Sequence, residues 1–508
     1  MLEEKQSEKN LVVTINSGKI AGECRNGLAI FRGIPYGGAC EGERRFLPPR
    51  PAQEWKGIKD CTKNGKYAIQ PGKDIVSTDD LGGYFSGGHP ELFGVDQQEQ
   101  DENCLVLNVM TPGVDDKKRP VVVYIHGGGF ATGSGTLVLG ADRWVQEEDI
   151  VVVGVNHRLN VFGYLYLGEY DKAYEDSGMA GMLDLILALE WVKQNISVFG
   201  GNPNLVTIMG ESGGGMKVST LMAMPSAKGL FQRAIVESGS APVGKISREE
   251  AVALTKELLE RLDIKEDEWQ KLLTVPAKDL ISAVNSLPFC PYTANENLCG
   301  FEEVREIPLL VGASEDELAV FLPVAELEIT EKNLKNQLLQ FSKQQLFGVA
   351  DIIDEENVDN IIKVFQEYHE NKITSKHLFL HIISQASFLG GGSFYQALEK
   401  VKQGGADVFS YLVKFDTPLP MAPDYKASWH TADLPLQMRI VLYPECEELS
   451  RKLGHCFAAF IRTGNPSTPE IVWPAFSEEK KETMMIDNEW SVKLDPLKQI
   501  HACMRVKW

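Results

Sequence analysis

The stretch from residue 206 to residue 216 constrains the fold of this chain more than any other. It reads Val-Thr-Ile-Met-Gly-Glu-Ser-Gly-Gly-Gly-Met, so a β-branched run is followed by the pattern G-x-S-x-G. The run predicts a short buried strand, and residues 216–224 predict a helix. Glycine at Gly210 and Gly214 removes side chains that would collide in a sharp turn between them. We therefore expect Ser212 at the top of a strand–turn–helix elbow, although a Gly-rich connection with an incidental serine also fits the pentapeptide alone.

Other apolar runs indicate further strands of the same sheet, and helical patterns lie between them. Strands that alternate with helices are typical of a mostly parallel sheet covered on both faces. The chain is therefore predicted to have an α/β fold. The predicted strands cover residues 104–110, 120–126, 149–155, 233–239, 307–312 and 406–415, and the two clearest helices cover 181–195 and 447–463.

Two segments differ from this pattern, because they are mainly helical and carry charged faces. They cover residues 246–306 and 328–404. No repeat, low-complexity tract or flexible linker separates them from the rest of the chain. We expect one domain over residues 1–508, with these segments as cap-like insertions over the sheet.

The charge balance limits the partners of the chain. Its 508 residues include 51 Lys and Arg against 71 Asp and Glu, which gives a net charge of −20 at pH 7. Such an acidic surface repels nucleic acid and anionic membranes. No apolar run approaches the roughly 18 residues of a membrane span, and the polar N-terminus does not resemble a secretory signal. The nine scattered cysteines lack a C-x-x-C pair and predict free thiols in a cytoplasm, with no metal site.

A serine hydroxyl reacts as a nucleophile only when a base accepts its proton and an acid orients that base. α/β-Hydrolases supply these groups in the chain order Ser, Asp or Glu, His, each from a loop after a strand. After the predicted strand that ends at Gly312 come Glu315, Asp316 and Glu317, and spacing alone leaves the three open. His430 is the one histidine of nine on a loop beyond a late core strand, so it is the candidate base.

The run His126-Gly127-Gly128-Gly129-Phe130 follows a predicted buried strand. Attack on an ester carbonyl places negative charge on its oxygen, which needs N–H donors about 3 Å away. Consecutive glycines let the backbone approach that closely, whereas the simpler interpretation is a Gly-rich turn. Its position upstream of G-x-S-x-G matches the HGGG-type oxyanion motif.

Together these motifs resemble the type-B carboxylesterases, the family that also holds the cholinesterases. The resemblance extends from about residue 11 to the C-terminus. It implies an α/β-hydrolase fold, hydrolysis of carboxylic esters through an acyl-enzyme, and no cofactor. The matching stretches are Phe31-Arg-Gly-Ile-Pro-Tyr, Asn103-Cys-Leu-Val-Leu-Asn-Val, His126-Gly-Gly-Gly-Phe, Asn156-His-Arg-Leu-Asn-Val-Phe-Gly, Ala188-Leu-Glu-Trp-Val, Asn195-Ile-Ser-Val-Phe-Gly-Gly-Asn-Pro, Gly210-Glu-Ser-Gly-Gly and Thr463-Gly-Asn-Pro.

The resemblance also implies roles for individual residues. The family pattern G-x-x-x-x-E-G aligns with Gly312 through Leu318 and so selects Glu317 as the acid, beside Ser212 as nucleophile and His430 as base. The implied oxyanion donors are the N–H groups of Gly128, Gly129 and Gly213. Phe130 and Glu211 are expected at the substrate, although Glu211 fits a buried structural carboxylate equally well.

The chain departs from the family pattern at several places. Gly213 replaces the usual Ala, which leaves its N–H available, and Leu318 replaces the usual Gly after the acid. Secreted members pair the cysteine that corresponds to Cys104 with an earlier cysteine. That earlier cysteine is missing here, because residues 67–70 read Tyr-Ala-Ile-Gln. The missing bridge predicts a bacterial-like, cytoplasmic member.

We therefore predict a serine carboxylesterase that acts on short-to-medium acyl or aryl esters as a monomer or homodimer. Its expected partner is a small-molecule ester, with no nucleic acid, membrane or metal. One alternative is a specialised esterase or an amidase on plant, drug or acylated-sugar substrates. An alternative of another class is a non-catalytic binding module of the same fold.

Overall fold

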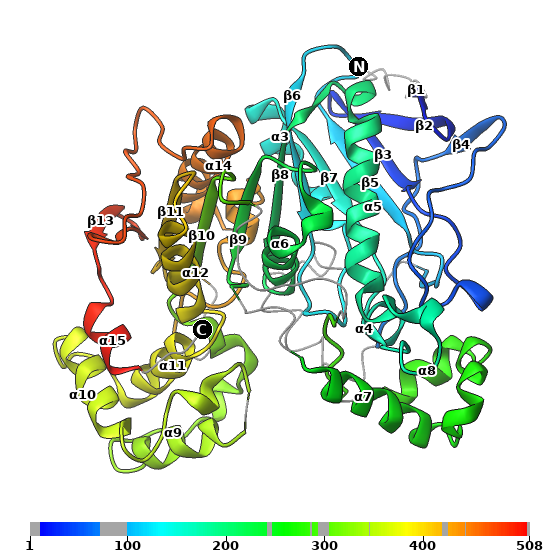
Figure 1. Cartoon of the computed structure of the whole chain (residues 1–508). Helices are drawn as coiled ribbons and strands as arrows, with labels where there is room; N and C mark the ends of the chain where they lie inside the picture. Colours follow the sequence, from blue (N-terminus) through cyan, green and yellow to red (C-terminus); the bar gives the residue numbers. More distant parts are fainter. Residues whose placement is uncertain are drawn as a thin grey trace, which may run out of the picture.

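A large twisted sheet forms the centre of the computed structural model (Figure 1), which describes residues 11–71, 99–240, 246–284, 287–292, 304–344, 346–418, 425–441 and 443–504. Within these ranges the sheet has 13 strands, and β4 (Ile58–Asp60) pairs with β2 beside the main path. The spatial order is β1 (Leu11–Ile15), β2 (Gly18–Arg25), β3 (Leu28–Pro35), β5 (Val106–Thr111), β7 (Val151–Val155), β6 (Arg119–Ile125), β8 (Gly201–Glu211), β9 (Arg233–Glu237), β10 (Leu309–Ser314), β11 (Val408–Val413), β12 (Glu482–Ile486) and β13 (Ser491–Leu494).

The middle of the sheet is parallel and its edges are antiparallel. Every neighbouring pair from β7 through β6, β8, β9, β10 and β11 to β12 is parallel. The pairs β1–β2, β2–β3, β3–β5, β5–β7 and β12–β13 are antiparallel. All residues of β7, β10 and β11 are buried, as expected for strands covered on both faces. The predicted α/β-hydrolase fold with a mostly parallel sheet is confirmed.

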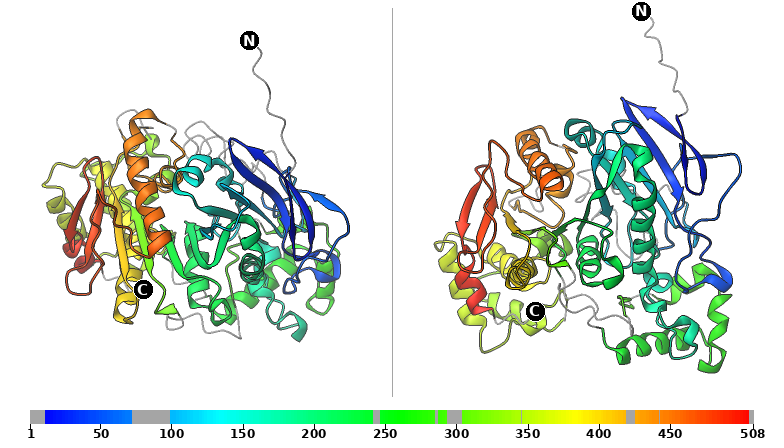
Figure 2. Two further views of the ribbon diagram at one scale, coloured as in Figure 1. Left: turned by 90° about the horizontal axis from the view of Figure 1, so that it is seen from above. Right: turned by 45° about the horizontal axis from the view of Figure 1, so that its top comes forward.

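Helices cover both faces of this sheet, as the views in Figure 2 show. Val121 and Val123 of β6 point into a core shared with α5 (Ala180–Asn195), α6 (Gly213–Ala223) and α12 (Gly391–Lys402). Val122 and Tyr124 point to the opposite core, which α3 (Asp142–Glu148) and α14 (Glu447–Thr463) close. Successive strand residues face opposite sides, so one apolar run builds both cores.

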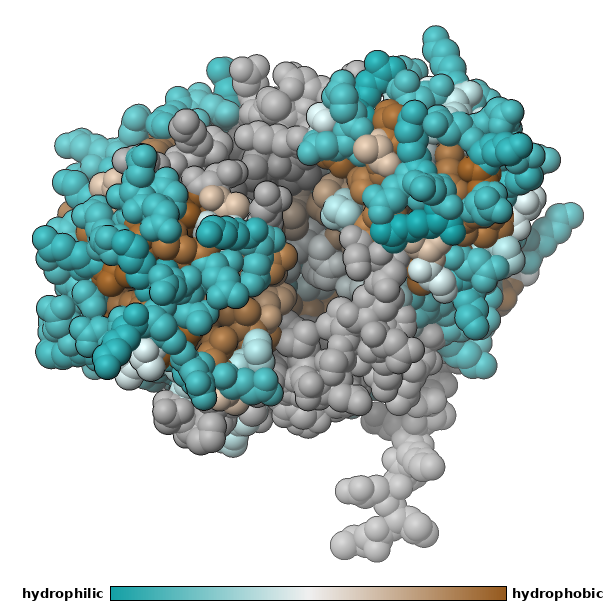
Figure 3. All heavy atoms as spheres, turned by 90° about the horizontal axis from the view of Figure 1, so that it is seen from below, coloured by the Kyte–Doolittle hydropathy of each residue, from teal (hydrophilic) through white to brown (hydrophobic). Residues whose placement is uncertain are grey.

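Two groups of helices lie below the sheet in Figure 1. One contains α7 (Arg248–Arg261) and α8 (Ala277–Ala283), and Ser247 and Glu250 form a capping box at the start of α7. Residues 266–273 form a 3₁₀-helix. The other group contains α9 (Leu334–Ser342), α10 (Val358–Tyr368) and α11 (Ser375–Ala386), which share a separate apolar core. Seen from below, the molecule is hollowed at its centre, with apolar residues on both sides of the hollow (Figure 3).

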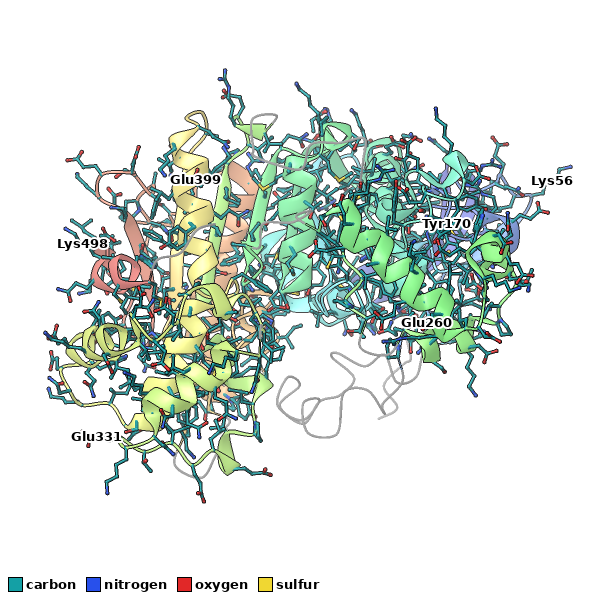
Figure 4. The ribbon with its side chains drawn as sticks, turned by 60° about the horizontal axis from the view of Figure 1, so that its bottom comes forward. Lys56, Tyr170, Glu260, Glu331, Glu399 and Lys498 are labelled. Atoms are coloured by element: carbon teal, nitrogen blue, oxygen red, sulfur yellow. The ribbon has the colours of Figure 1, made fainter. Side chains whose placement is uncertain are left out.

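Charged side chains lie mainly on the outside of the molecule. Lys56, Glu331 and Lys498 extend from its periphery in Figure 4, and all three are exposed.

In the described ranges, no helix is long and apolar enough to cross a membrane. All eight cysteines of those ranges are free, whereas Cys299 lies outside the described residues.

Candidate active site

The elbow between β8 and α6 has the sharp geometry that the glycine pattern predicts. Ser212 lies between them with φ 57° and ψ −125°, a strained backbone conformation of the kind that concentrates at functional sites. A Cβ added to Gly210 would lie under 3.0 Å from the backbone of Gly214, and one added to Gly214 would meet Ile125 O. The helix begins at Gly213 and therefore earlier than the predicted residue 216.

The acid candidate meets the base candidate directly. Glu317 is fully buried just after β10, and its Oε2 accepts a hydrogen bond from His430 Nδ1 at 2.5 Å. Its Oε1 accepts from the Ser238 hydroxyl at 2.5 Å and from the Ser314 N–H at 2.6 Å. These bonds fix the carboxylate, so the hydrogen at Nδ1 leaves Nε2 as the basic nitrogen of the neutral ring.

Among the described residues, neither neighbouring carboxylate forms a hydrogen bond or an ion pair with His430. Glu315 forms an ion pair with Lys414 at 3.0 Å. Asp316 pairs with Trp429 in a short parallel bridge, and its N–H donates to Ser428 O at 3.0 Å. This bridge holds the acid loop beside the loop of His430. Of the three candidates that spacing leaves open, Glu317 is the one that contacts the imidazole.

His430 Nε2 lies 3.2 Å from Glu211 Oε1, and both side chains are buried. Burial opposes protonation of His430, but the charges of Glu211 and Glu317 outweigh it and raise the pKa of His430 to about 9. Burial raises the pKa of Glu211 to about 8. No hydrogen bond joins the Ser212 hydroxyl to Nε2 within the described part of the chain, and such catalytic contacts are often long before a substrate binds.

The predicted oxyanion loop, residues His126–Phe130, lies against the elbow. Gly128 and Gly129 have φ of +81° and +61°, which glycine adopts without strain. A Cβ added to Gly213 would lie under 3.0 Å from the backbone of Gly129. In the part of the chain that the structure describes, the N–H groups of Gly128, Gly129 and Gly213 donate to no protein acceptor. The structure therefore brings together the three amides that the sequence motifs single out.

Aromatic rings lie beside these groups. Phe130 is buried and packs against Tyr164, with ring centroids 5.1 Å apart. Phe321 is half-buried, and its ring centroid lies 5.2 Å from that of His430 and 4.9 Å from that of Phe347. The sequence motifs do not single out Phe321, because it belongs to no motif.

Two further polar residues of the site, Ser238 and Ser314, also lie outside the sequence motifs. Ser238 and Ser314 hold Glu317 from the carboxyl ends of β9 and β10. A polar residue at the end of a buried strand is a usable signal, since sites of α/β folds collect at that edge. No group of three or more His, Cys, Asp or Glu that could hold a metal occurs among the described residues.

Comparison with known proteins identifies the family. Residues 9–503 match the model of the carboxylesterase family. This chain belongs to that family. It is 31% identical to para-nitrobenzyl esterase of Bacillus subtilis over 96% of this chain and 96% of that protein. It also resembles the solved carboxylesterase of Geobacillus stearothermophilus, with a TM-score of 0.79 and 30% identity over 97% of this chain and 100% of that one.

A third relative is an esterase of Clostridium hathewayi, whose structure matches with a TM-score of 0.79 and 30% identity over 98% of each chain. That protein is described as hydrolysing aliphatic aromatic polyesters. Membership of the family makes the present chain a carboxylic ester hydrolase that acts on small-molecule esters, and an acyl-enzyme mechanism is general in the family.

Proposed function

We propose that this carboxylesterase uses Ser212 as its nucleophile, His430 as its general base and Glu317 as the acid that orients His430. The hydrogen bond of 2.5 Å between His430 Nδ1 and Glu317 Oε2 carries this proposal, because it joins side chains 113 residues apart beside the elbow serine. A carboxylate in this position fixes the tautomer of the imidazole and stabilises the imidazolium that forms during catalysis.

The reaction then follows from the positions of these groups. His430 turns its Nε2 from Glu211 to the Ser212 hydroxyl and accepts the proton while Oγ attacks the ester carbonyl. The N–H groups of Gly128, Gly129 and Gly213 bind the resulting oxyanion. The alcohol leaves with the proton from Nε2, and a water activated by the same nitrogen attacks the acyl-enzyme and releases the acid.

The proposed substrates are short-to-medium acyl or aryl esters. Phe321 supports this proposal, because its half-buried ring stands beside His430 and offers an apolar surface to an aromatic or alkyl group. We also propose that the two predicted insertions, residues 246–306 and 328–404, border the entrance to the site with the helices that the structure describes in them. Free buried thiols such as Cys61 and Cys456 fit a reducing cytoplasm, and a monomer or homodimer is the proposed assembly.

An organophosphate label and one substitution test the nucleophile. Digestion and mass spectrometry of the labelled protein should place the phosphoryl group on Ser212. Ser212→Ala should lower kcat for p-nitrophenyl butyrate by about 10⁴-fold or more, with the exposed Ser226→Ala as the matched control. A label on another residue, or an unchanged rate in Ser212→Ala, would contradict the proposal. Comparing the matched p-nitroanilide with the ester separates an amidase from an esterase.

A further inference from the structure

Lys217 is buried directly behind the oxyanion loop, unlike the exposed Lys56 and Lys498 at the periphery of Figure 4. It lies on α6, five residues after Ser212, and its exposed fraction is 0%. Lysine is almost never fully buried unless it is paired. Among the described residues no carboxylate forms an ion pair with Lys217, and burial alone lowers its pKa to about 7. Such a costly position requires a structural or functional reason.

The partners of its amino group are two main-chain carbonyls of the loop. Lys217 Nζ donates to Gly129 O at 2.7 Å and to His126 O at 3.1 Å. The same nitrogen lies 5.5 Å from the centre of the Phe130 ring. These contacts reach both ends of the loop, so a single side chain ties it to α6. The amino group has at least two N–H donors whether or not it is protonated.

The inner carbonyls of the loop are also held. Gly127 O accepts from His126 Nδ1 at 2.9 Å, and Gly128 O accepts from the N–H of Thr132 at 3.0 Å. Because the peptide group is planar, a fixed carbonyl fixes the direction of the N–H in the same plane. The carbonyls of residues 126–129 are therefore all held by hydrogen bonds, whereas the N–H groups of Gly128 and Gly129 have no protein acceptor within the described ranges.

Gly213 and Lys217 act on the loop from the same face of α6, because residues four apart in a helix lie one above the other. At Gly213 the missing side chain admits the loop, since a Cβ there would lie under 3.0 Å from the Gly129 backbone. At Lys217 the amino group holds the loop in that close position. The two residues therefore make complementary contributions to the same contact.

We propose that Lys217 is a positioning residue of the oxyanion hole. Its amino group holds the loop against α6, so that the N–H groups of Gly128, Gly129 and Gly213 converge on one oxygen. This role rests on the proposed function, in which those three amides bind the oxyanion. Lys217 contacts no reacting atom and acts through the loop.

The substitution Lys217→Met tests this role, because methionine fills a similar volume and has no N–H donor. Loss of one oxyanion donor lowers kcat by 10²- to 10³-fold, so a loosened loop should lower it by about 10- to 100-fold. We expect KM for p-nitrophenyl butyrate to change little. The affinity for an alkyl trifluoromethyl ketone, which adds to the serine and forms an oxyanion, should fall by the same factor as kcat. A merely structural role would not make these two quantities fall together.

Lys400→Met is the matched control, since Lys400 is also fully buried and, among the residues that the structure describes, donates to one carbonyl, Arg305 O, at 2.8 Å. It should lose comparable stability in thermal unfolding and keep kcat and the ketone affinity within about 2-fold. If Lys217→Met does not fold, Lys217→Gln replaces it, because glutamine retains an N–H donor on a shorter side chain; kcat and ketone affinity should again fall together.

Two results would overturn the role of Lys217. One is a folded Lys217 variant with kcat and ketone affinity within about 2-fold of wild type. The other is an equal loss in Lys400→Met, which would assign the effect to stability. A wild-type enzyme that the ketone does not inhibit and organophosphate does not label at Ser212 would instead contradict the proposed serine mechanism, so the two failures are distinguishable.

Discussion

The contact between Glu211 and His430 leads to a specific prediction about pH dependence. A base must be neutral to accept the proton of Ser212, and the pKa of His430 is raised to about 9. Activity should therefore rise with pH along an acid limb that lies well above the ordinary histidine value of about 6.5. Glu211→Gln removes the negative charge that contributes most to stabilising the imidazolium. Its expected effect is to lower the pKa of His430 and move the acid limb to lower pH.

The distance between His430 Nε2 and Glu211 Oε1 sets the size of this pKa shift. At 3.2 Å and an effective dielectric constant of about 20, two unit charges interact by about 5 kcal/mol, or about 4 pK units. That figure is an upper limit, because burial raises the pKa of Glu211 to about 8 and the carboxyl is largely protonated below that pH. The two groups titrate as a coupled pair, and we expect the limb to move by about 1–2 pH units.

The assay is kcat/KM for p-nitrophenyl acetate between about pH 5 and pH 9.5, corrected for spontaneous hydrolysis at each pH, since kcat/KM reports the free enzyme. Glu169→Gln, which removes an exposed carboxylate, changes the net charge equally and should leave the limb in place. An acid limb that Glu211→Gln leaves unmoved would refute the reasoning, because the nearest charge to Nε2 would then have no influence on its protonation.

Three further variants test other parts of the structure. Glu317→Gln should lower kcat for p-nitrophenyl butyrate by about 10⁴-fold, because His430 loses the group that fixes its tautomer and stabilises its charge. Phe321→Ala should lower the kcat/KM ratio of p-nitrophenyl benzoate to the butyrate by about 2- to 10-fold, and an unchanged ratio would remove Phe321 from the substrate site. Asp184→Asn should cost about 3–5 kcal/mol in urea unfolding, because it leaves the buried guanidinium of Arg158 without the carboxylate that lies 2.6 Å away; a loss below about 1 kcal/mol would contradict this.

The parallel strands were predictable because their signal is local. A strand covered on both faces must be apolar at every position, whichever elements cover it. Residues 120–126 are such a run, and the structure has β6 at Arg119–Ile125. The start of α6 was harder to predict from the sequence, because three glycines in succession have a low helix propensity. The requirement for glycine at Gly214 comes from Ile125, a residue 89 positions earlier, because a Cβ at Gly214 would meet Ile125 O.

The acid of the proposed triad could not be chosen from local sequence signals. Spacing after β10 could not separate Glu315, Asp316 and Glu317, because the choice depends on which side chain faces the loop of His430. Glu315 forms an ion pair with Lys414. The backbone bridge between Asp316 and Trp429 holds the acid loop beside the loop of His430. Both partners come from segments about 100 residues later in the chain. Only the family pattern, which already contains that information, could select Glu317 from the sequence.

Lys217 was missed for a related reason. A single lysine in a helix is expected to reach solvent, and nothing adjacent to it in the sequence signals a buried position. Its acceptors, His126 O and Gly129 O, lie 91 and 88 residues earlier. Main-chain carbonyls also carry no residue-type signal, so no search for oppositely charged partners would have found them.

The parallel order of the strands explains why so many buried charged groups meet at one place. Glu211 ends β8, the loop with the carbonyl acceptors of Lys217 follows β6, and Glu317 follows β10. Carboxyl ends of parallel strands share one edge of the sheet, so segments distant in the chain arrive there together. At that edge burial works against the charged form, which raises the pKa of Glu211 and lowers that of Lys217. The apolar cores on both faces of the sheet supply the stability that lets the fold retain these unfavourable groups, and the same desolvation strengthens the electrostatic interactions on which the proposed reaction depends.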